Sequence, residues 1–309
     1  MIDIVIGTRG SKLAVIQAEE LQTRLREVFP EFKSSLVKIN TTGDRYGATA
    51  LDEFAEQGIF VKELEKALLD RRIDLAVHSL KDLPVEIPDG LLLAATTARL
   101  DPRDVFISRF GKLADLASGS KIGTGSRRRA IQLLSLRPDL QILGIRGNID
   151  TRLRKVSNGE FDGVIVAAAA LIRLGWEDRI TEYLPQEHFT PAVGQGTLGI
   201  EIRSVDKEMA ALVSKINDKT TWQAITAERT FLQALGGGCR APIAALGTIS
   251  DGVLKLTGMV SGADASHILR ATEQGDALEP EQIGKRLARK MVESGALSLI
   301  AASGEPNLS

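Results

Sequence analysis

The chain has 309 residues, of which 39 are basic and 40 are acidic, so its formal net charge is −1. A balanced charge excludes binding to nucleic acid or membrane through a general positive field, so any anion site must come from local clusters. The hydrophobic content of 43% is sufficient for two or three domains of ordinary size. The opening residues 1–6 lack the features of a signal peptide and no apolar run has membrane-spanning length, so we expect a cytoplasmic protein.

Strands and helices alternate along the first part of the chain. Residues 2–6 predict a strand that runs into Gly7-Thr8-Arg9-Gly10-Ser11, and Ser11 is a typical N-cap for a helix that reaches Val28. Further elements are expected as strands at 36–39, 73–77 and 91–95 and a helix at 59–69. The charged, glycine-containing segment 42–58 is expected to be a mobile loop of the kind that forms a lid.

A second series of the same kind follows Asp101-Pro102-Arg103-Asp104, which marks a crossing. Gly123-Thr124-Gly125-Ser126 repeats the opening turn before another helix, and Pro191–Gly196 marks a second crossing. Strands are expected at 140–145, 164–168 and 198–203, and a helix near the end of the chain is expected from Pro280 to Glu293. We therefore predict an α/β protein with two similar doubly wound, periplasmic-binding-protein-like lobes and a smaller C-terminal α+β domain. The predicted boundaries are 1–98 with 197–217 for domain 1, 99–196 for domain 2 and 218–309 for domain 3.

The only cysteine of the chain, Cys239, follows three glycines. Apolar residues at helical spacing predict a helix over 221–235, and Gly236 should end it because glycine adopts the left-handed conformation without steric cost. The neighbouring Arg240 favours a thiolate at Cys239. A single cysteine excludes a disulfide within the chain and a multi-cysteine metal site, which leaves either a reactive thiol or a buried packing residue.

Six arginines fall at predicted strand ends or early helical turns, where open α/β sheets bind their ligands. They are Arg9, Arg128, Arg129, Arg146, Arg152 and Arg173. Guanidinium groups bind carboxylates and phosphates, and the helix starts after the two Gly-Thr turns also favour anions. Any one of these arginines can equally be solvated surface charge, but six in such positions favour a polyanionic ligand. Carboxylates are favoured over phosphates because the chain has no G-x-x-x-x-G-K-[ST] loop.

Lys81 and Asp82 follow the strand expected at 73–77. A carboxylate at a strand end can act as a general acid or base or stabilise a developing cation, and the alternative is a structural salt bridge. A Schiff base on Lys81 is a further alternative, which nothing around that lysine favours. The histidines lie too far apart in sequence to form a ligand motif, so neither a metal site nor a Cys–His pair is predicted. They are His78, His188 and His267.

Five motifs, in this order, resemble those of the porphobilinogen deaminase family. They are Ala-Val-His-Ser-Leu-Lys-Asp-Leu-Pro at 76–84, Gly-Thr-Gly-Ser-Arg-Arg-Arg at 123–129, Arg-Gly-Asn at 146–148, Thr-Arg-Leu at 151–153 and the Gly-Gly-Cys segment ending at Cys239. The resemblance covers nearly the whole chain. It implies a transferase of tetrapyrrole biosynthesis that joins four porphobilinogens into hydroxymethylbilane and releases four ammonia molecules. It also implies a dipyrromethane cofactor, bound to Cys239 through a thioether, and no metal.

The resemblance also implies roles for single residues. Asp82 matches the catalytic aspartate, which contacts pyrrole N–H groups and stabilises positive charge. Cofactor binding is implied for Lys81, Asp82, Thr124, Ser126, Arg128, Arg129, Arg146 and Gly147. Substrate binding is implied for Arg9, Ser11, Arg152, Arg173 and Gln195, and Gln195-Gly196 matches the interdomain hinge. Two positions depart from the family pattern, because Gln57 replaces a common lysine and Gly125 replaces a common serine.

Two other functions remain open from the residues. A two-lobed anion-binding module would have the same paired lobes, but it would explain neither the Gly-Gly-Gly-Cys turn nor the missing signal peptide. A cysteine acyl transferase would need a histidine partner that the sequence does not place. The resemblance implies porphobilinogen as substrate, hand-over of product to uroporphyrinogen III synthase, and no nucleic acid or membrane partner. The lack of a long exposed apolar stripe favours a monomer.

Overall fold

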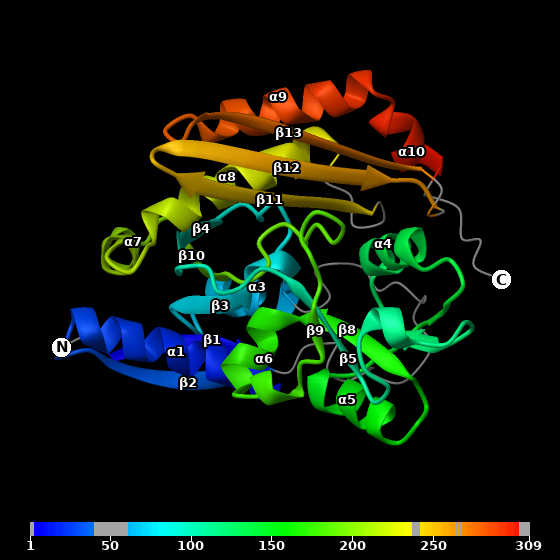
Figure 1. The fold of residues 1–309 in the computed structure, drawn as a ribbon. Coiled ribbons are helices and arrows are strands. Elements are labelled where there is room, and N and C mark those ends of the chain that lie inside the picture. Colours follow the sequence, from blue (N-terminus) through cyan, green and yellow to red (C-terminus); the bar gives the residue numbers. More distant parts are fainter. Residues whose placement is uncertain (1–2, 40–60, 237–241, 264, 266, 303–309) are drawn as a thin grey trace. The chain divides into compact units, whose positions relative to one another are not determined.

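The computed structural model describes residues 3–39, 61–236, 242–263, 265 and 267–302. Within them the strands form three sheets, and the described residues divide into two compact units (Figure 1). Unit 1 comprises residues 3–39, 61–100 and 195–222, and unit 2 comprises residues 101–194 and those from 223 onward. The predicted division into three domains stays a prediction.

The sheet of unit 1 has the strand order β2-β1-β3-β10-β4. Its elements are β1 (Asp3–Arg9), α1 (Lys12–Val28), β2 (Lys33–Ile39), α3 (Lys62–Leu69), β3 (Leu75–Ser79), β4 (Leu91–Thr96), β10 (Leu198–Arg203) and α7 (Lys207–Ser214). β2, β1 and β3 run parallel, and β10 is antiparallel to both β3 and β4. Ile4 and Ile6 of β1 share a core with α1 and α7, whereas Val5 packs against the core that contains α3. Helices therefore cover both faces of this sheet, as predicted for a doubly wound lobe.

The α/β sheet of unit 2 repeats this arrangement with the order β7-β6-β8-β5-β9. Its elements are β5 (Asp104–Ser108), β6 (Lys121–Gly123), α4 (Arg127–Leu136), β7 (Gln141–Leu143), α5 (Ile149–Ser157), β8 (Gly163–Ala167), α6 (Ala168–Leu174) and β9 (Glu182–Tyr183). β7, β6 and β8 are parallel, and β5 is antiparallel to β8. Val105 and Ile107 pack with α5 and α6, while Phe106 faces the core that includes α4.

The two α/β sheets are alike in detail, which confirms the prediction of two similar lobes. In each sheet the antiparallel strand is the first strand after a crossing, namely β5 after residues 101–103 and β10 after residues 191–197. β1 and β6 occupy the same place between two parallel neighbours. A side chain at Gly7 would collide with Ile73, and one at Gly123 would meet Ile145 at 3.0 Å, so a larger residue at either position would displace its neighbour.

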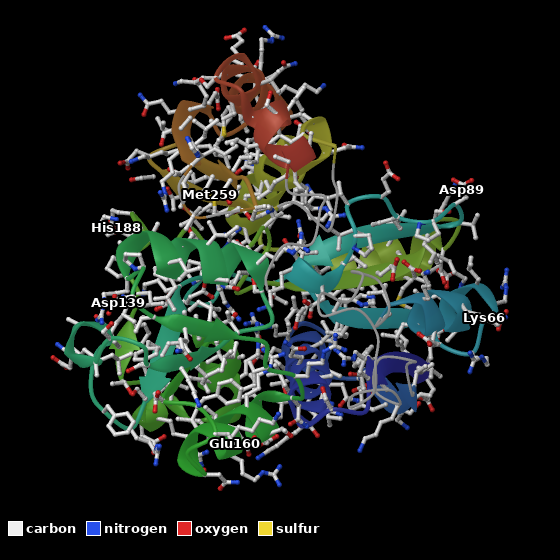
Figure 2. All side chains as sticks on the ribbon, turned by 90° about the vertical axis from the view of Figure 1, so that its right-hand side faces the viewer. Lys66, Asp89, Asp139, Glu160, His188 and Met259 are labelled. Atoms are coloured by element: carbon white, nitrogen blue, oxygen red, sulfur yellow. The ribbon has the colours of Figure 1, made fainter. Side chains whose placement is uncertain are left out.

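The third sheet is an antiparallel meander of β11 (Ile243–Ser250), β12 (Val253–Ser261) and β13 (Ile268–Asp276). α8 (Lys219–Ala234) and α9 (Pro280–Glu293) enclose its core, and α10 (Ala296–Ala302) follows. Figure 1 shows α9 lying along these strands, and Figure 2 labels Met259 on β12. This small sheet with its helices confirms the predicted C-terminal α+β part.

Most predicted elements are present with small shifts of their ends. α9 has the bounds that its proline start predicts, and Gly236 has a φ of 93°, which matches its predicted helix-ending role. The strand expected at 140–145 is shorter in the structure, where β7 covers Gln141–Leu143. β5 was expected only as part of a crossing. The loop expected at 42–58 and the residues around Cys239 lie outside the described residues.

We expect Phe231→Ala to lower the free energy of unfolding by about 3–5 kcal/mol, because it removes a large side chain from a close-packed core. Phe231 of α8 is fully buried, and its ring leaves no space for a side chain at Gly258 of β12. Urea unfolding followed by circular dichroism measures the loss. Leu278→Ala is the matched control, because Leu278 is 69% exposed. Equal losses in the two variants would contradict this account of the core.

Candidate functional site

Five of the predicted residues lie at one edge of the sheet of unit 1. β1 and β3 are parallel neighbours with Gly7 opposite Ala76, so the segments after Arg9 and Ser79 leave the sheet at the same edge. Ser11 caps α1 by accepting a hydrogen bond from the N–H of Ala14 at 3.3 Å. Lys81 and Asp82 lie in a single 3₁₀ turn directly after β3. Lys81 Nζ donates to Gln195 Oε1 at 3.2 Å, which brings Gln195 into the same group.

Short hydrogen bonds between α1 and the strands β1 and β3 hold the segments at this edge in place. Gln17 of α1 donates from Nε2 to the hydroxyl of Ser79 at 2.8 Å, and Thr8 Oγ1 donates to the carbonyl of Ala14 at 2.8 Å. The 3₁₀ turn is closed by the N–H of Leu83, which donates to the carbonyl of Leu80 at 3.1 Å. Asp82 is half-buried on this turn. The backbone of Asp82 is therefore held by this turn, and its side chain is only partly buried.

Helix starts define the corresponding edge of unit 2. Ser126 caps α4 by accepting from the N–H of Arg129 at 3.5 Å, and Asn148 caps α5 by accepting from the N–H of Thr151 at 3.0 Å. Thr124 Oγ1 accepts from the N–H of Ser126 at 3.2 Å. Since β6 and β7 are parallel neighbours, both helix starts lie at one edge of the sheet. Each leaves backbone N–H groups that can bind an anion.

Three predicted arginines belong to the segments that follow β7 and β8. Arg146 and Gly147 precede α5, and Arg152 in its first turn donates from Nε to the carbonyl of Gly147 at 2.8 Å. Arg173 was expected at a strand end or an early helical turn, and that placement is wrong. It lies in the last turn of α6, because this seven-residue helix begins directly after β8. Arg146 and Arg152 therefore lie on either side of the start of α5, whereas Arg173 lies at the end of α6.

Arg128 and Arg129 point into the protein and share one buried carboxylate, that of Asp104. Arg128 Nη1 lies 2.8 Å from Asp104 Oδ2 and also donates to the carbonyl of Thr190 at 2.7 Å. Arg129 donates to Asp104 Oδ1 from Nε at 3.0 Å and from Nη2 at 2.7 Å. All three side chains are less than 9% exposed. Two guanidinium charges against one carboxylate leave a single positive charge at the start of α4.

The charge state of Asp104 follows from these contacts. Burial alone would raise the pKa of Asp104, but the adjacent charges of Arg128 and Arg129 outweigh burial and hold its pKa far below the usual range. From the sequence, Asp104 was expected only to mark part of a crossing. An available signal was its position before Val105-Phe106-Ile107, because an aspartate that opens a buried strand needs a cationic partner.

Other buried ionisable groups had no role predicted from the sequence. Glu228 of α8 accepts hydrogen bonds from the N–H groups of Gly194 and Gly247, each at 2.8 Å. His78 of β3 was expected to be an ordinary residue, but it is buried and its Nε2 lies 2.9 Å from Glu201 Oε2 on β10. These contacts hold the segments next to Gln195 and Lys81. The pair Gly194–Glu228 is 34 positions apart in the sequence and the pair His78–Glu201 is 123 positions apart, so patterns within a single element do not reveal them.

The two departures from the family pattern have different outcomes. Gln57 lies outside the described residues, as do Cys239 and Arg240. A Cβ at Gly125 would lie 3.1 Å from the carbonyl oxygen of Ile145, so a serine there requires a small shift of that backbone. The described residues contain no group of three or more histidine, cysteine or acidic side chains placed to hold a metal ion. No helix among them has the length and apolar character needed to span a membrane.

Comparison with known proteins gives a consistent result. Residues 4–211 match the model of "Porphobilinogen deaminase, dipyromethane cofactor binding domain", and residues 222–293 match "Porphobilinogen deaminase, C-terminal domain". The porphobilinogen deaminase of Syntrophobacter fumaroxidans is 44% identical over 298 residues, covering 96% of both chains. That of Desulforudis audaxviator is 46% identical over 300 residues, covering 97% of both chains.

Two solved structures are distantly similar to the chain. A nutrient binding protein from Burkholderia cenocepacia bound to methionine has a TM-score of 0.43 and 12% identity, covering 69% of this chain and 90% of that one. A probable amino-acid ABC transporter extracellular-binding protein from Bacillus subtilis has a TM-score of 0.42 and 11% identity, covering 70% and 90%. Likenesses at this level support no conclusion about fold or function.

We expect Asp104→Asn to lower the free energy of unfolding at pH 7 by about 3–5 kcal/mol, because it leaves two buried guanidinium groups without their counter-charge. The pKa of Asp104 is lower in the folded chain than in the unfolded chain, so its stabilisation is complete above about pH 4 and declines below it. The difference between the wild type and the variant should therefore be constant from about pH 7 to 5 and shrink below about pH 4.

Urea unfolding across this pH range measures both effects. Asp139→Asn is the matched control, because Asp139 pairs with Arg137 at 2.7 Å on the surface. That exposed pair should contribute much less than the buried cluster. A pH-independent difference between the wild type and Asp104→Asn would show that the Asp104 charge does not stabilise the fold.

Proposed function

The chain belongs to the porphobilinogen deaminase family, and we propose that Asp82, Cys239 and the cationic helix starts carry its chemistry. The enzyme, also called hydroxymethylbilane synthase, condenses porphobilinogen into hydroxymethylbilane with loss of ammonia and uses a dipyrromethane cofactor. The observation that carries this function is the match of residues 4–211 and 222–293 to the two domains of this family. The residue roles proposed below come from the family motifs, and the contacts of the described residues support them.

The donor groups at the edge of unit 2 fit a dipyrromethane, which bears carboxylates on two apolar rings. The starts of α4 and α5 present N–H groups, and the cluster of Arg128, Arg129 and Asp104 leaves one positive charge beside them. When bound, the cofactor supplies the pyrrole carbon on which the chain is extended. The residues that we propose to hold it are Lys81, Asp82, Thr124, Ser126, Arg128, Arg129, Arg146 and Gly147.

Arg128 and Arg129 act in this proposal mainly through their charge. Their N–H groups already bind Asp104 and the carbonyls of Thr190 and Ile165, so few donors are left for a ligand. The hydroxyl of Ser126 and the first N–H groups of α4 lie next to this charge and can bind the carboxylate directly. The arginines thus raise the affinity for an anion at a helix start that they also hold in place.

Substrate binding is proposed for residues that lie near the strand ends or on the helices that follow. Each porphobilinogen brings an acetate and a propionate group, which suit guanidinium and hydroxyl donors. Gln195 also accepts the hydrogen bond from Lys81, so it can set the position of that ammonium group. The proposed substrate-binding residues are Arg9, Ser11, Arg152, Arg173 and Gln195.

Asp82 is proposed as the catalytic residue. When ammonia leaves, the C–N bond of the aminomethyl group breaks and the pyrrole ring takes up positive charge, with its N–H more acidic than before. A carboxylate that accepts this N–H hydrogen bond stabilises the cation more than the neutral substrate, which lowers the barrier. The half-buried position of Asp82 on a closed 3₁₀ turn provides a preorganised acceptor.

Cys239 is proposed as the cofactor attachment point. It lies outside the described residues, but α8 ends at Ala234 and Gly236 adopts a left-handed conformation with a φ of 93°. The chain therefore leaves a well-packed helix shortly before the cysteine, and glycines separate the two. A thiol on such a segment can form a thioether to a bulky group without displacing the core.

The remaining predictions on organisation belong to the same proposal. Domain 1 would comprise 1–98 with 197–217, domain 2 would comprise 99–196 and domain 3 would comprise 218–309, with a hinge at Gln195-Gly196. Gly196 has a φ of 92°, and a Cβ there would lie 2.6 Å from the carbonyl of Leu100, so glycine is required. The single cysteine rules out an internal disulfide, which is in keeping with the proposed cytoplasmic location. We also propose that the protein is a monomer and that it passes its product to uroporphyrinogen III synthase.

We expect Asp82→Asn to lower kcat by at least about 100-fold, because the amide retains the shape of the side chain but not its charge. Porphobilinogen consumption and ammonia release are measured on holoenzyme with equal cofactor content and an unchanged circular dichroism spectrum. Glu86→Gln, which removes an exposed carboxylate four residues further along, should leave kcat unchanged. Near wild-type turnover in Asp82→Asn holoenzyme would disprove the proposed charge stabilisation.

We expect the intact mass of the denatured wild-type protein to exceed the mass of the bare chain by two substrate-derived pyrrole units. Peptide mapping should place this excess on the peptide that contains Cys239, and Cys239→Ser should lack it. If the wild type is isolated as the bare chain, incubation with porphobilinogen should add the same mass. An excess on another peptide, or no gain after incubation, would contradict attachment at Cys239.

A further inference from the structure

Unit 2 contains a pocket of about 420 Å³ that includes none of the residues assigned above. One wall is a face of α5, where Asp150, Leu153 and Arg154 recur at helical spacing. The other walls are formed by the end of β5 and the following Arg109, and by the turn after α6, which contains Trp176. Figure 2 labels Glu160, which follows α5 in the chain. The volume lies in the range of small-molecule sites, about 300–1,000 Å³.

Three arginines line this pocket, and none forms a salt bridge with a carboxylate in the part of the chain that the structure describes. They are Arg109, Arg154 and Arg179. Other arginines of the protein are paired with acids: Arg24, Arg103, Arg137, Arg203 and Arg286. Asp150 is the one acidic residue in the pocket lining, and it does not pair with Arg154 one helical turn later. The lining therefore has a net charge of +2, from three arginines and one aspartate.

An aromatic ring and an apolar floor complete the pocket. Trp176 is half-buried, and the guanidinium of Arg179 lies 4.4 Å from the centre of its ring. Leu153 and Ile107 are each only 8% exposed and contribute to the core below. Arg109 lies over the ring of Phe110, with its guanidinium 5.1 Å from the ring centre. Indole faces and aliphatic side chains bind flat apolar groups, while guanidinium groups that are not paired with a carboxylate can bind one from a ligand. The combination matches a ligand with one flat ring and one or two carboxylates.

The pocket is separate from the proposed catalytic edge. Ser108, at the end of β5, pairs with Gly163, the first residue of β8, whereas the catalytic edge follows the last residues of the parallel strands. Arg152 is adjacent to Leu153 in α5, and neighbouring helical residues do not share a face. Its Nε instead binds the carbonyl of Gly147. None of the proposed substrate-binding residues lines the pocket.

We propose that this pocket is a second binding site of the enzyme, for a small aromatic carboxylate with a single ring. The ring lies against Trp176 and Leu153, and its carboxylates bind Arg154, Arg109 or Arg179. Porphobilinogen, a pyrrole with two carboxylates, belongs to this class of ligand, and that identification rests on the proposed function. Another aromatic acid has the same chemistry, so binding experiments must separate the two sources.

The test uses tryptophan fluorescence, because Trp176 and Trp222 are the two tryptophans of the chain. In Trp222→Phe holoenzyme, Trp176 alone reports on the pocket. The probes are benzene-1,3-dicarboxylate and the analogue of porphobilinogen that has a methyl group in place of the aminomethyl group and so cannot lose ammonia. We expect a saturable fluorescence change with both, weakened about tenfold by Arg154→Gln through loss of a charge-assisted hydrogen bond. Lys155→Gln removes the same charge from another face of α5 and should have little effect.

The outcomes separate the possibilities. Tighter binding of the pyrrole analogue than of the benzene diacid assigns the pocket to the substrate class, and equal binding assigns it to aromatic acids in general. The absence of a saturable change, or equal affinities in the Arg154→Gln and Lys155→Gln proteins, overturns the proposal. Equally tight binding of inorganic phosphate or of neutral benzene-1,3-dicarboxamide overturns the requirement for an aromatic acid. The analogue should also inhibit porphobilinogen consumption competitively, which measures its binding at the catalytic edge. This inhibition constant should be the same in the wild type and in Arg154→Gln.

Discussion

The carboxylate of Asp104 joins the start of α4 to the first strand of the α/β part of unit 2. Asp104 is the first residue of β5, directly after one crossing, and it binds Arg128 and Arg129 at the start of α4. Arg128 also binds the carbonyl of Thr190, the last residue before the second crossing, and Gln132 of α4 bonds to both the N–H and the carbonyl of Thr190. One helix start thus fixes both segments through which the chain passes between the units.

A cluster of this kind is costly as a source of stability. Removing two guanidinium groups and a carboxylate from water offsets much of their attraction, and apolar residues of equal size often stabilise a fold as well. The ion cluster also fixes the position of the first turn of α4 and leaves one positive charge there. Ser126, whose side chain caps the same helix turn, cannot move without disturbing Arg128 and Arg129, and the surplus positive charge stays in the protein interior, where water screens it weakly. Both consequences favour a bound carboxylate at the start of α4.

Local features of the sequence predicted much of this structure, and long-range contacts explain what they missed. Pro280 marks the start of α9, Gly236 ends α8, and Ser11 and Ser126 cap their helices, because each effect involves residues a few positions apart. The arginines of α4 were recognised as an anion-binding feature, but their partner Asp104 lies about 25 positions away and no pattern within one element joins them. The candidate site residues were proposed largely from the family motifs, whereas the pairing of His78 with Glu201 required the register of β3 and β10.

The two α/β sheets show how one topology supports different chemistry. β1 and β6 occupy equivalent places and both lead into a serine-capped helix, so both edges can bind an anion. In unit 1 the neighbouring strand β3 delivers Lys81 and the half-buried Asp82, so a negative charge lies among the cations. In unit 2 the neutralising carboxylate, Asp104, is fully buried. Asp104 is fully buried against its two arginines, whereas Asp82 is only half-buried, so of the two carboxylates Asp82 is the one that a ligand can reach and on which the proposed stabilisation of a transient cation depends.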